Sequence, residues 1–223
     1  MPFPFELAVD PGLLAILALV AFVAGFIDAI AGGGGLLTIP ALLTAGLPPH
    51  LVLGTNKLCA TLGSATASYT FYRRQLFNPA LWRNGLLGTA IGALLGASLA
   101  HWLPAAWLNQ MLPVVVFACG LYLLFSGPPR VAPAVVAAIP RGRQWPQGLA
   151  LGFYDGVAGP GTGAFWTVSN MLLYPLDLLR ASGVARSMNF VSNAMALAVF
   201  IVHGQVAWLL GIGMGLALMA GAF

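Results

Sequence analysis

The stretch GFIDAIAGGG at residues 25–34 returns later in the chain as GFYDGVAGPG at residues 152–161. Six of the ten positions are identical, and Asp28 and Asp155 are among them. A second match follows at nearly the same spacing, where GTNK at 54–57 aligns with GVAR at 183–186. Each half of the chain therefore has a glycine-rich break and then an apolar segment that begins with a basic residue.

The composition excludes most soluble functions. Of the 223 residues 60% are hydrophobic and only 6% are charged, whereas about 25% are charged in a typical soluble protein. The net charge of +4 comes from basic residues scattered between apolar segments, which is unlike a nucleic-acid-binding surface. We therefore exclude a soluble enzyme, a disordered chain and a nucleic-acid-binding protein, and expect the lipid bilayer as the main partner.

The apolar segments predict an all-α polytopic membrane protein, because a helix needs about 20 apolar residues to cross the hydrocarbon layer. Three shorter apolar segments lie beside the two breaks: 36–47, 147–158 and 164–173. We expect an N-terminal repeat at 12–126, a cytoplasmic linker at 127–146 and a C-terminal repeat at 147–223. The predicted full spans are Leu13–Ala31, Leu51–Tyr72, Gly85–Leu103, Trp107–Phe125, Gly183–Val202 and Val206–Phe223.

The distribution of basic residues predicts the orientation, because Lys and Arg favour cytoplasmic loops. Eight arginines fall on one side of the predicted spans, and only Lys57 lies near the other side. The N-terminus is therefore expected outside, and its lack of a basic region argues against a signal peptide. The predicted cytoplasmic residues are Arg73, Arg74, Arg83, Arg130, Arg141, Arg143, Arg180 and Arg186.

The two halves are predicted to have opposite orientations. The first half contains a broken hairpin and three full spans, which is an odd number of crossings, so the second half starts on the other side. Secondary transporters are built in this way, with broken helices that meet at the binding site. Irregular backbone at this depth is tolerated only inside protein or along a polar cavity.

The two breaks are the predicted site for a small anion. Glycines allow close backbone approach and expose N–H groups, and a helix that begins after such a break attracts anions. Thr38 and Thr162 supply hydroxyl donors close by. The remaining predicted residues of the breaks are Gly32, Gly33, Gly34, Gly35, Gly159, Gly161 and Gly163.

Five charged or amide side chains complete the predicted substrate path. Lys57 and Arg186 occupy equivalent positions about one turn inside their spans, where they either reach the headgroups or contact substrate. Asn189 and Asn193 share one helix face with Arg186, and Asn56 precedes Lys57. This face either lines a cavity or joins helices.

Asp28 and Asp155 precede the breaks by four residues. We expect each of them either to cap the turn, which we favour, or to pair with a basic residue or carry a coupling proton. Gly88, Gly92 and Gly96 recur at every fourth position and predict a close helix contact, either within the protomer or at a homodimer interface.

No motif indicates an enzyme, a metal site or a cofactor. The sequence lacks HExxH and Cys/His ligand patterns, and Cys59 and Cys119 form no disulfide framework. His50, His101 and His203 are far apart in sequence.

GFIDAIAGGGGLLTIPALLTAG with GTNKLCATLGSATASY, and GFYDGVAGPGTGAFW with ASGVARSMNFVSN, resemble the two repeats of the sulfite exporter TauE/SafE family. The resemblance covers residues 12–223. It implies an inner-membrane permease of bacteria that moves sulfite, sulfonates or related sulfur-containing organic anions. Alternatives are an uncoupled anion channel and a non-transporting membrane subunit. The second half lacks a counterpart of Trp107–Phe125, so we expect one span fewer than the family usually has, either because the chain is truncated or because it is a short variant.

Overall fold

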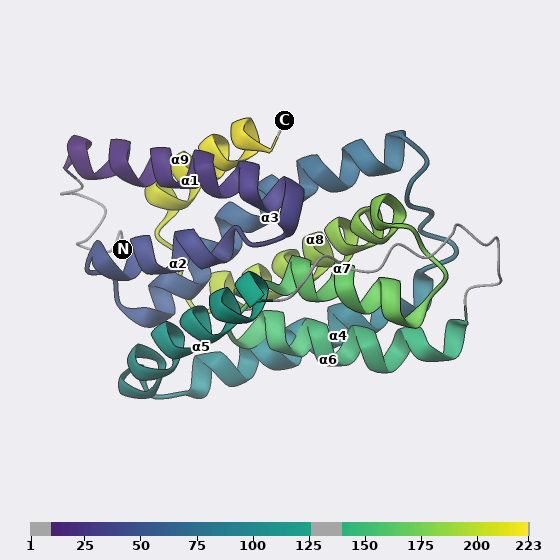
Figure 1. The fold of residues 1–223 in the computed structure, drawn as a ribbon. Coiled ribbons are helices and arrows are strands. Elements are labelled where there is room, and N and C mark those ends of the chain that lie inside the picture. Colours follow the sequence, from purple (N-terminus) through teal and green to yellow (C-terminus); the bar gives the residue numbers. More distant parts are fainter. Residues whose placement is uncertain (1–9, 126–139, 223) are drawn as a thin grey trace.

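A computed structural model describes residues 10–125 and 140–222, and every regular element in these ranges is an α-helix (Figure 1). The all-α class is therefore confirmed for the described part of the chain. In chain order the helices are α1 (Pro11–Ala31), α2 (Gly35–Thr44), α3 (Pro49–Arg73), α4 (Arg83–Trp102), α5 (Ala105–Phe125), α6 (Arg141–Val157), α7 (Thr162–Leu173), α8 (Leu178–Val202) and α9 (Trp208–Gly221).

Helices α3 and α8 pack on each other in the interior of the bundle, and pairs of other helices cover them. α1 packs on α9, α4 packs on α6, and each of the pairs also contacts α3 or α8. α1 and α2 run in opposite directions in Figure 1, as do α6 and α7, and each pair is joined by a short turn. The two turns bring irregular backbone into the middle of the bundle.

The α4–α6 contact is built from glycines on both helices. A Cβ on Gly92 of α4 would lie 2.4 Å from the Leu149 carbonyl oxygen, and one on Gly96 would lie 2.2 Å from that of Phe153. From the other side, a Cβ on Gly156 of α6 would lie 2.4 Å from the Ala93 oxygen. The predicted glycine stripe is therefore engaged by α6 within the protomer and is not free to form a dimer interface.

The α1–α9 contact repeats this arrangement. A Cβ on Gly25, the first residue of the repeated stretch, would lie 2.1 Å from the Leu218 carbonyl oxygen of α9. Gly221 of α9 lies equally close to α1, since its Cβ would be 2.0 Å from the Phe22 oxygen. The backbones of α1 and α9 can touch directly because glycine has no side chain at these positions.

Four described helices are long and apolar enough to cross a membrane: α1, α4, α5 and α8. The chain is thus a multi-pass membrane protein. α3 is as long as α8, but its polar residues keep it out of this group, and α9 has only 14 residues. α3 and α9 thus form at the predicted spans 51–72 and 206–223, but they are less clear membrane spans than these four helices.

Two predicted helix starts were wrong. α6 begins at Arg141, inside the predicted linker, and it contains Pro146. α8 begins at Leu178 rather than at Gly183, because Asp177 accepts a hydrogen bond from the Arg180 N–H and so caps the helix. Residues 127–139 of the predicted linker, which include Arg130, lie outside the described residues.

Arginines and histidines gather at opposite ends of the bundle. Arg73, Arg83 and Arg180 lie at or near the ends of α3, α4 and α8 where these helices meet the predicted cytoplasmic loops. At the other end, the rings of His101 and His203 stack with centroids 3.6 Å apart, and His50 meets His101 edge-on at 6.5 Å. Histidines that are remote in sequence are thus neighbours, yet no group of three potential metal ligands occurs among the described residues.

Candidate functional site

The two glycine-rich breaks meet in the middle of the bundle. α1 ends at Ala31, and Gly32 has a φ of 80°, which lets the chain turn into α2. α6 ends at Val157, and Gly159 and Gly161 have φ values of 87° and 74° before α7 begins. A Cβ on Gly32 would lie 2.4 Å from the Gly163 carbonyl carbon. The breaks therefore touch through backbone atoms, and glycine is required on both sides.

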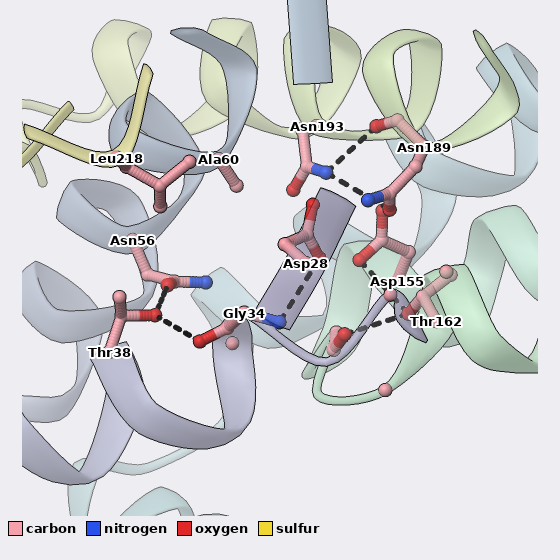
Figure 2. Close-up of a pocket in the computed structure, with 15 residues that line it drawn as sticks. Asp28, Gly34, Thr38, Asn56, Ala60, Asp155, Thr162, Asn189, Asn193 and Leu218 are labelled. Carbon is pink, nitrogen blue, oxygen red and sulfur yellow. Dashed lines mark hydrogen bonds between the residues drawn. The ribbon is translucent and has the colours of Figure 1, made fainter. Parts of the chain in front are cut away.

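A small cavity lies at this meeting point, and Figure 2 shows the side chains that point into it. The space open to the centre of a water molecule is about 20 Å³, which is room for about one water molecule. The cavity is therefore nearly closed in this conformation. Its lining residues are Asp28, Gly32, Gly34, Gly35, Thr38, Asn56, Ala60, Asp155, Gly159, Gly161, Thr162, Gly163, Asn189, Asn193 and Leu218.

Most of the predicted site residues line this cavity, and the exceptions are Gly33, Lys57 and Arg186. Gly33 belongs to the turn but does not line the cavity. Ala60 and Leu218 line it without having been predicted, because apolar residues of a membrane helix carry no signal for a site. Lys57 and Arg186 do not line the cavity, but they lie next to residues that do, Asp155 and Gly163.

Lys57 is fully buried and joins the two halves of the chain. Its ammonium donates to Asp155 Oδ1 at 2.8 Å, to the Asp155 carbonyl oxygen at 2.5 Å and to Asn193 Oδ1 at 3.1 Å. None of its surface is exposed. The interpretation that Lys57 reaches the headgroups is therefore wrong: α3 begins at Pro49, which places Lys57 two turns inside the helix, opposite Asp155.

Three side chains donate hydrogen bonds to Asp155. Besides Lys57, the hydroxyl of Thr162 donates to Oδ1 at 3.2 Å, and the hydroxyl of Ser192 donates to Oδ2. The side chain is almost completely buried. Asp155 therefore works as the acceptor at the centre of a buried network, and not as the turn cap that we favoured. Ser192 was missed, although its spacing of three from Asn189 places both on one helix face.

Arg186 is the counterpart of Lys57 and has a different environment. Both are the ninth residue of a 25-residue helix. Arg186 is fully buried, but none of its three guanidinium nitrogens has a hydrogen-bond partner. A Cβ on Gly163 would lie 2.6 Å from Nη1. The prediction of Arg186 at the cytoplasmic face was wrong, because α8 begins earlier and carries this residue into the interior.

Asp28 occupies the position in the first break that is equivalent to Asp155 in the second, and it lines the same cavity. It is only partly buried, and its Oδ1 accepts one hydrogen bond, from the Gly34 N–H at 3.0 Å. Asp28 therefore caps the first turn, as favoured from the sequence. Its position in Figure 2 is between the two breaks, facing the cavity.

The amide side chains tie the helices around the cavity together. The Thr38 hydroxyl donates to Asn56 Oδ1 at 2.5 Å and to the Gly34 carbonyl oxygen at 3.2 Å. Asn193 donates to both the backbone oxygen and the side-chain oxygen of Asn189. In Figure 2 the Asn56 and Asn193 amides turn toward the space between the breaks. The predicted polar face of α8 thus lines a cavity and also joins helices.

Comparisons with known proteins agree with this architecture. The family model described as sulfite exporter TauE/SafE matches residues 17–223. A probable membrane transporter protein from Sinorhizobium is 42% identical over 94% of this chain and 80% of its own length. A probable membrane transporter protein from Haemophilus influenzae is 42% identical over 94% and 81%.

A third relative has a similar degree of identity. The probable membrane transporter protein YfcA of Escherichia coli is 39% identical over 96% of this chain and 80% of its own length. No solved structure matches the chain significantly. Since the family model covers nearly the whole chain and these relatives are named as membrane transporters, the chain belongs to the sulfite exporter TauE/SafE family and is a membrane transporter of that type.

Proposed function

We propose that the protein moves a small anion, a sulfite, a sulfonate or a related sulfur-containing organic anion, by alternating access around the two glycine-rich breaks. The observation that carries this proposal is the guanidinium of Arg186, which is fully buried beside Gly163 and has no hydrogen-bond partner. A buried guanidinium without hydrogen bonds is costly. A bound anion would supply the missing partner.

The chemistry of Arg186 favours an anion with several oxygens. A guanidinium presents parallel N–H donors that match two oxygens of one acidic group. The N-terminus of α7, at Thr162 and Gly163, lies next to it and adds the partial positive charge of a helix start. Sulfite and sulfonates offer three oxygens on one sulfur and fit this donor set.

The helix contacts support two repeats of opposite orientation. If α1, α2, α3 and α4 correspond to α6, α7, α8 and α9, the α1–α9 contact becomes the α6–α4 contact. In the same exchange the α3–α9 contact becomes α8–α4, and α3–α8 is unchanged. In Figure 1, α1 and α6 begin at opposite edges of the molecule and both end near its middle. This is the plan on which rocking around a fixed central site depends.

The volume of the cavity favours a transporter over an open channel. About 20 Å³ admits roughly one water molecule and no sulfonate. Helices must therefore separate before an anion enters. With the arginine-rich end in the cytoplasm and the N-terminus outside, we place the protein in the inner membrane of a bacterium, with the anion as its substrate and no cofactor.

Replacing Arg186 with glutamine is expected to weaken anion binding strongly while the protein still folds, because the substitution removes a buried charge that has no hydrogen-bond partner to lose. Loss of hydrogen bonds to a charged group weakens binding roughly 10- to 100-fold. The measurement is uptake of radiolabelled methanesulfonate or sulfite into proteoliposomes. In detergent, the same anions should raise the melting temperature of the wild type and not of the variant.

The matched control is Arg180→Gln, which removes a half-exposed arginine of the same helix. It should transport like the wild type. Equal uptake by Arg186→Gln and wild type would contradict the proposed site. Wild-type protein that neither binds nor moves any of these anions would contradict the proposed function and favour a non-transporting subunit.

A further inference from the structure

The four charged side chains around the cavity are unequally paired. Lys57 and Asp155 form an ion pair at 2.8 Å in which both side chains are buried. Arg186 has no hydrogen-bond partner, and Asp28 holds only the N–H of Gly34 among the described contacts. Asp155 and Lys57 occupy sequence positions equivalent to those of Asp28 and Arg186. Of these two pairs, however, only Asp155 and Lys57 form an ion pair in the described part of the chain.

The charges of these four residues cancel when the cavity holds no anion. Two cations and two carboxylates give a net charge of zero in a closed space in the interior of a membrane protein. Entry of a singly charged anion would leave one uncompensated negative charge there. Such a charge is far more costly in a membrane interior than in water. Neutrality returns if one of the two carboxylates takes up a proton.

Asp155 is the wrong carboxylate for this proton. It accepts hydrogen bonds from the Lys57 ammonium, the Thr162 hydroxyl and the Ser192 hydroxyl, and hydrogen bonds and a cation favour the ionised form. Protonation would also leave Lys57 as an unpaired buried charge. Asp155 therefore stays ionised while Lys57 is in place.

Asp28 meets the requirement better. It lines the cavity and is only partly buried, so water can reach it when the cavity opens. Of the helices packed against α1, namely α9, α3, α2 and α7, only α3 brings a charged side chain to the site, and that is Lys57. Arg186 and Asp155 complete the charges around it. Once an anion occupies Arg186, no free cation is left to stabilise the Asp28 carboxylate.

We propose that Asp28 binds one proton whenever a singly charged anion occupies Arg186, so that the protein carries anion and proton together with no net charge. The proton comes from water on the side where the anion enters and returns to water where it leaves. This inference rests on the proposed function, since it assumes that an anion binds at Arg186. It goes beyond that function by naming a second cargo and the residue that carries it.

The test uses wild-type protein in proteoliposomes with a trapped pH-sensitive dye, and methanesulfonate as the anion because it stays ionised at neutral pH. An inward methanesulfonate gradient should acidify the lumen by one proton per anion taken up. Uptake should not respond to an imposed membrane potential. An uncoupled anion would instead be excluded roughly 50-fold by an inside-negative potential of about 100 mV.

Asp28→Asn isolates the role of the carboxylate, because the amide keeps the shape of the side chain and an acceptor for the Gly34 N–H while it cannot bind the proton. In this variant, exchange of labelled for unlabelled methanesulfonate should continue at a reduced rate. Lumen acidification should be lost, and net uptake should become sensitive to potential. The control is Asp177→Asn, which changes the exposed cap of α8 and should keep proton and anion flux coupled.

The outcomes separate the two proposals. Anion uptake by the wild type without acidification, and with dependence on potential, would overturn the coupling and leave the anion site intact. Acidification that survives in Asp28→Asn would overturn the assignment to this residue. If no anion moves at all, both proposals fail. If Asp28→Asn does not fold, the wild-type flux ratio and its response to potential still decide the coupling.

Discussion

We expect the substitution Lys57→Met to destabilise the folded protein more than the replacement of any other single charged residue. The variant leaves Asp155 buried with an unpaired negative charge and removes three hydrogen bonds from the ammonium. Breaking a buried ion pair by removing one partner costs about 3–5 kcal/mol. The pair also joins the two halves of the chain, so the contact between α3 and α6 should loosen.

Melting of the detergent-purified protein, followed by tryptophan fluorescence, measures this effect. The double variant Lys57→Met/Asp155→Asn is the informative partner, because asparagine removes the stranded charge. Its oxygen can still accept from one of the hydroxyls of Thr162 and Ser192, and its NH2 group can donate to the oxygen of the other. It should melt at a higher temperature than Lys57→Met alone. A single variant as stable as the wild type, or a double variant less stable than the single, would show that the pair contributes little to folding.

Alanine at Gly92 is expected to disrupt the α4–α6 contact, whereas alanine at Gly120 should leave the protein as stable or slightly more stable. A Cβ at Gly92 would lie 2.4 Å from the Leu149 carbonyl oxygen, which belongs to the backbone of α6 and cannot rotate away. At Gly120 of α5 no atom lies within 4 Å of the added Cβ. With alanine at Gly92, α4 must shift, at a cost of about 1–3 kcal/mol or more in stability. With alanine at Gly120, α5 gains about 1 kcal/mol in helix propensity.

The comparison is made between the same substitution at two helical glycines, so propensity cancels and packing remains. Melting temperature and the monodisperse fraction on size exclusion are the measurements. Gly156→Ala approaches the same contact from α6, where the Cβ would lie 2.4 Å from the Ala93 oxygen, and should behave like Gly92→Ala. Equal stability of the Gly92 and Gly120 variants would mean that the two helices do not pack as tightly as the structure shows.

The membrane class and the position of the two breaks follow from local features of the sequence. Long apolar segments must be helices in lipid because every backbone polar group needs an internal partner. The glycine-rich stretches at 32–35 and 159–163 interrupt these segments however the helices pack. The prediction that the breaks lie together at a polar cavity also rested on one-dimensional information, the repeat of ten residues around Asp28 and Asp155.

Helix starts were harder to predict, and Arg186 was misplaced as a result. The sequence predicts that the span containing Arg186 begins at Gly183. In the structure Asp177 caps the helix and Leu178 begins it. The additional turn is enough to carry Arg186 from the expected surface into the interior.

The repeated sequence, taken alone, predicted most of the residues that line the cavity, because the same glycine-rich pattern occurs twice and apolar flanks place both copies in the membrane. Only the tertiary structure decided that Lys57 is paired and Arg186 is not. The two occupy equivalent positions in equivalent helices. The partner of Lys57, Asp155, comes from the other half of the chain, and a distance of 2.8 Å across 98 residues depends on how the halves pack.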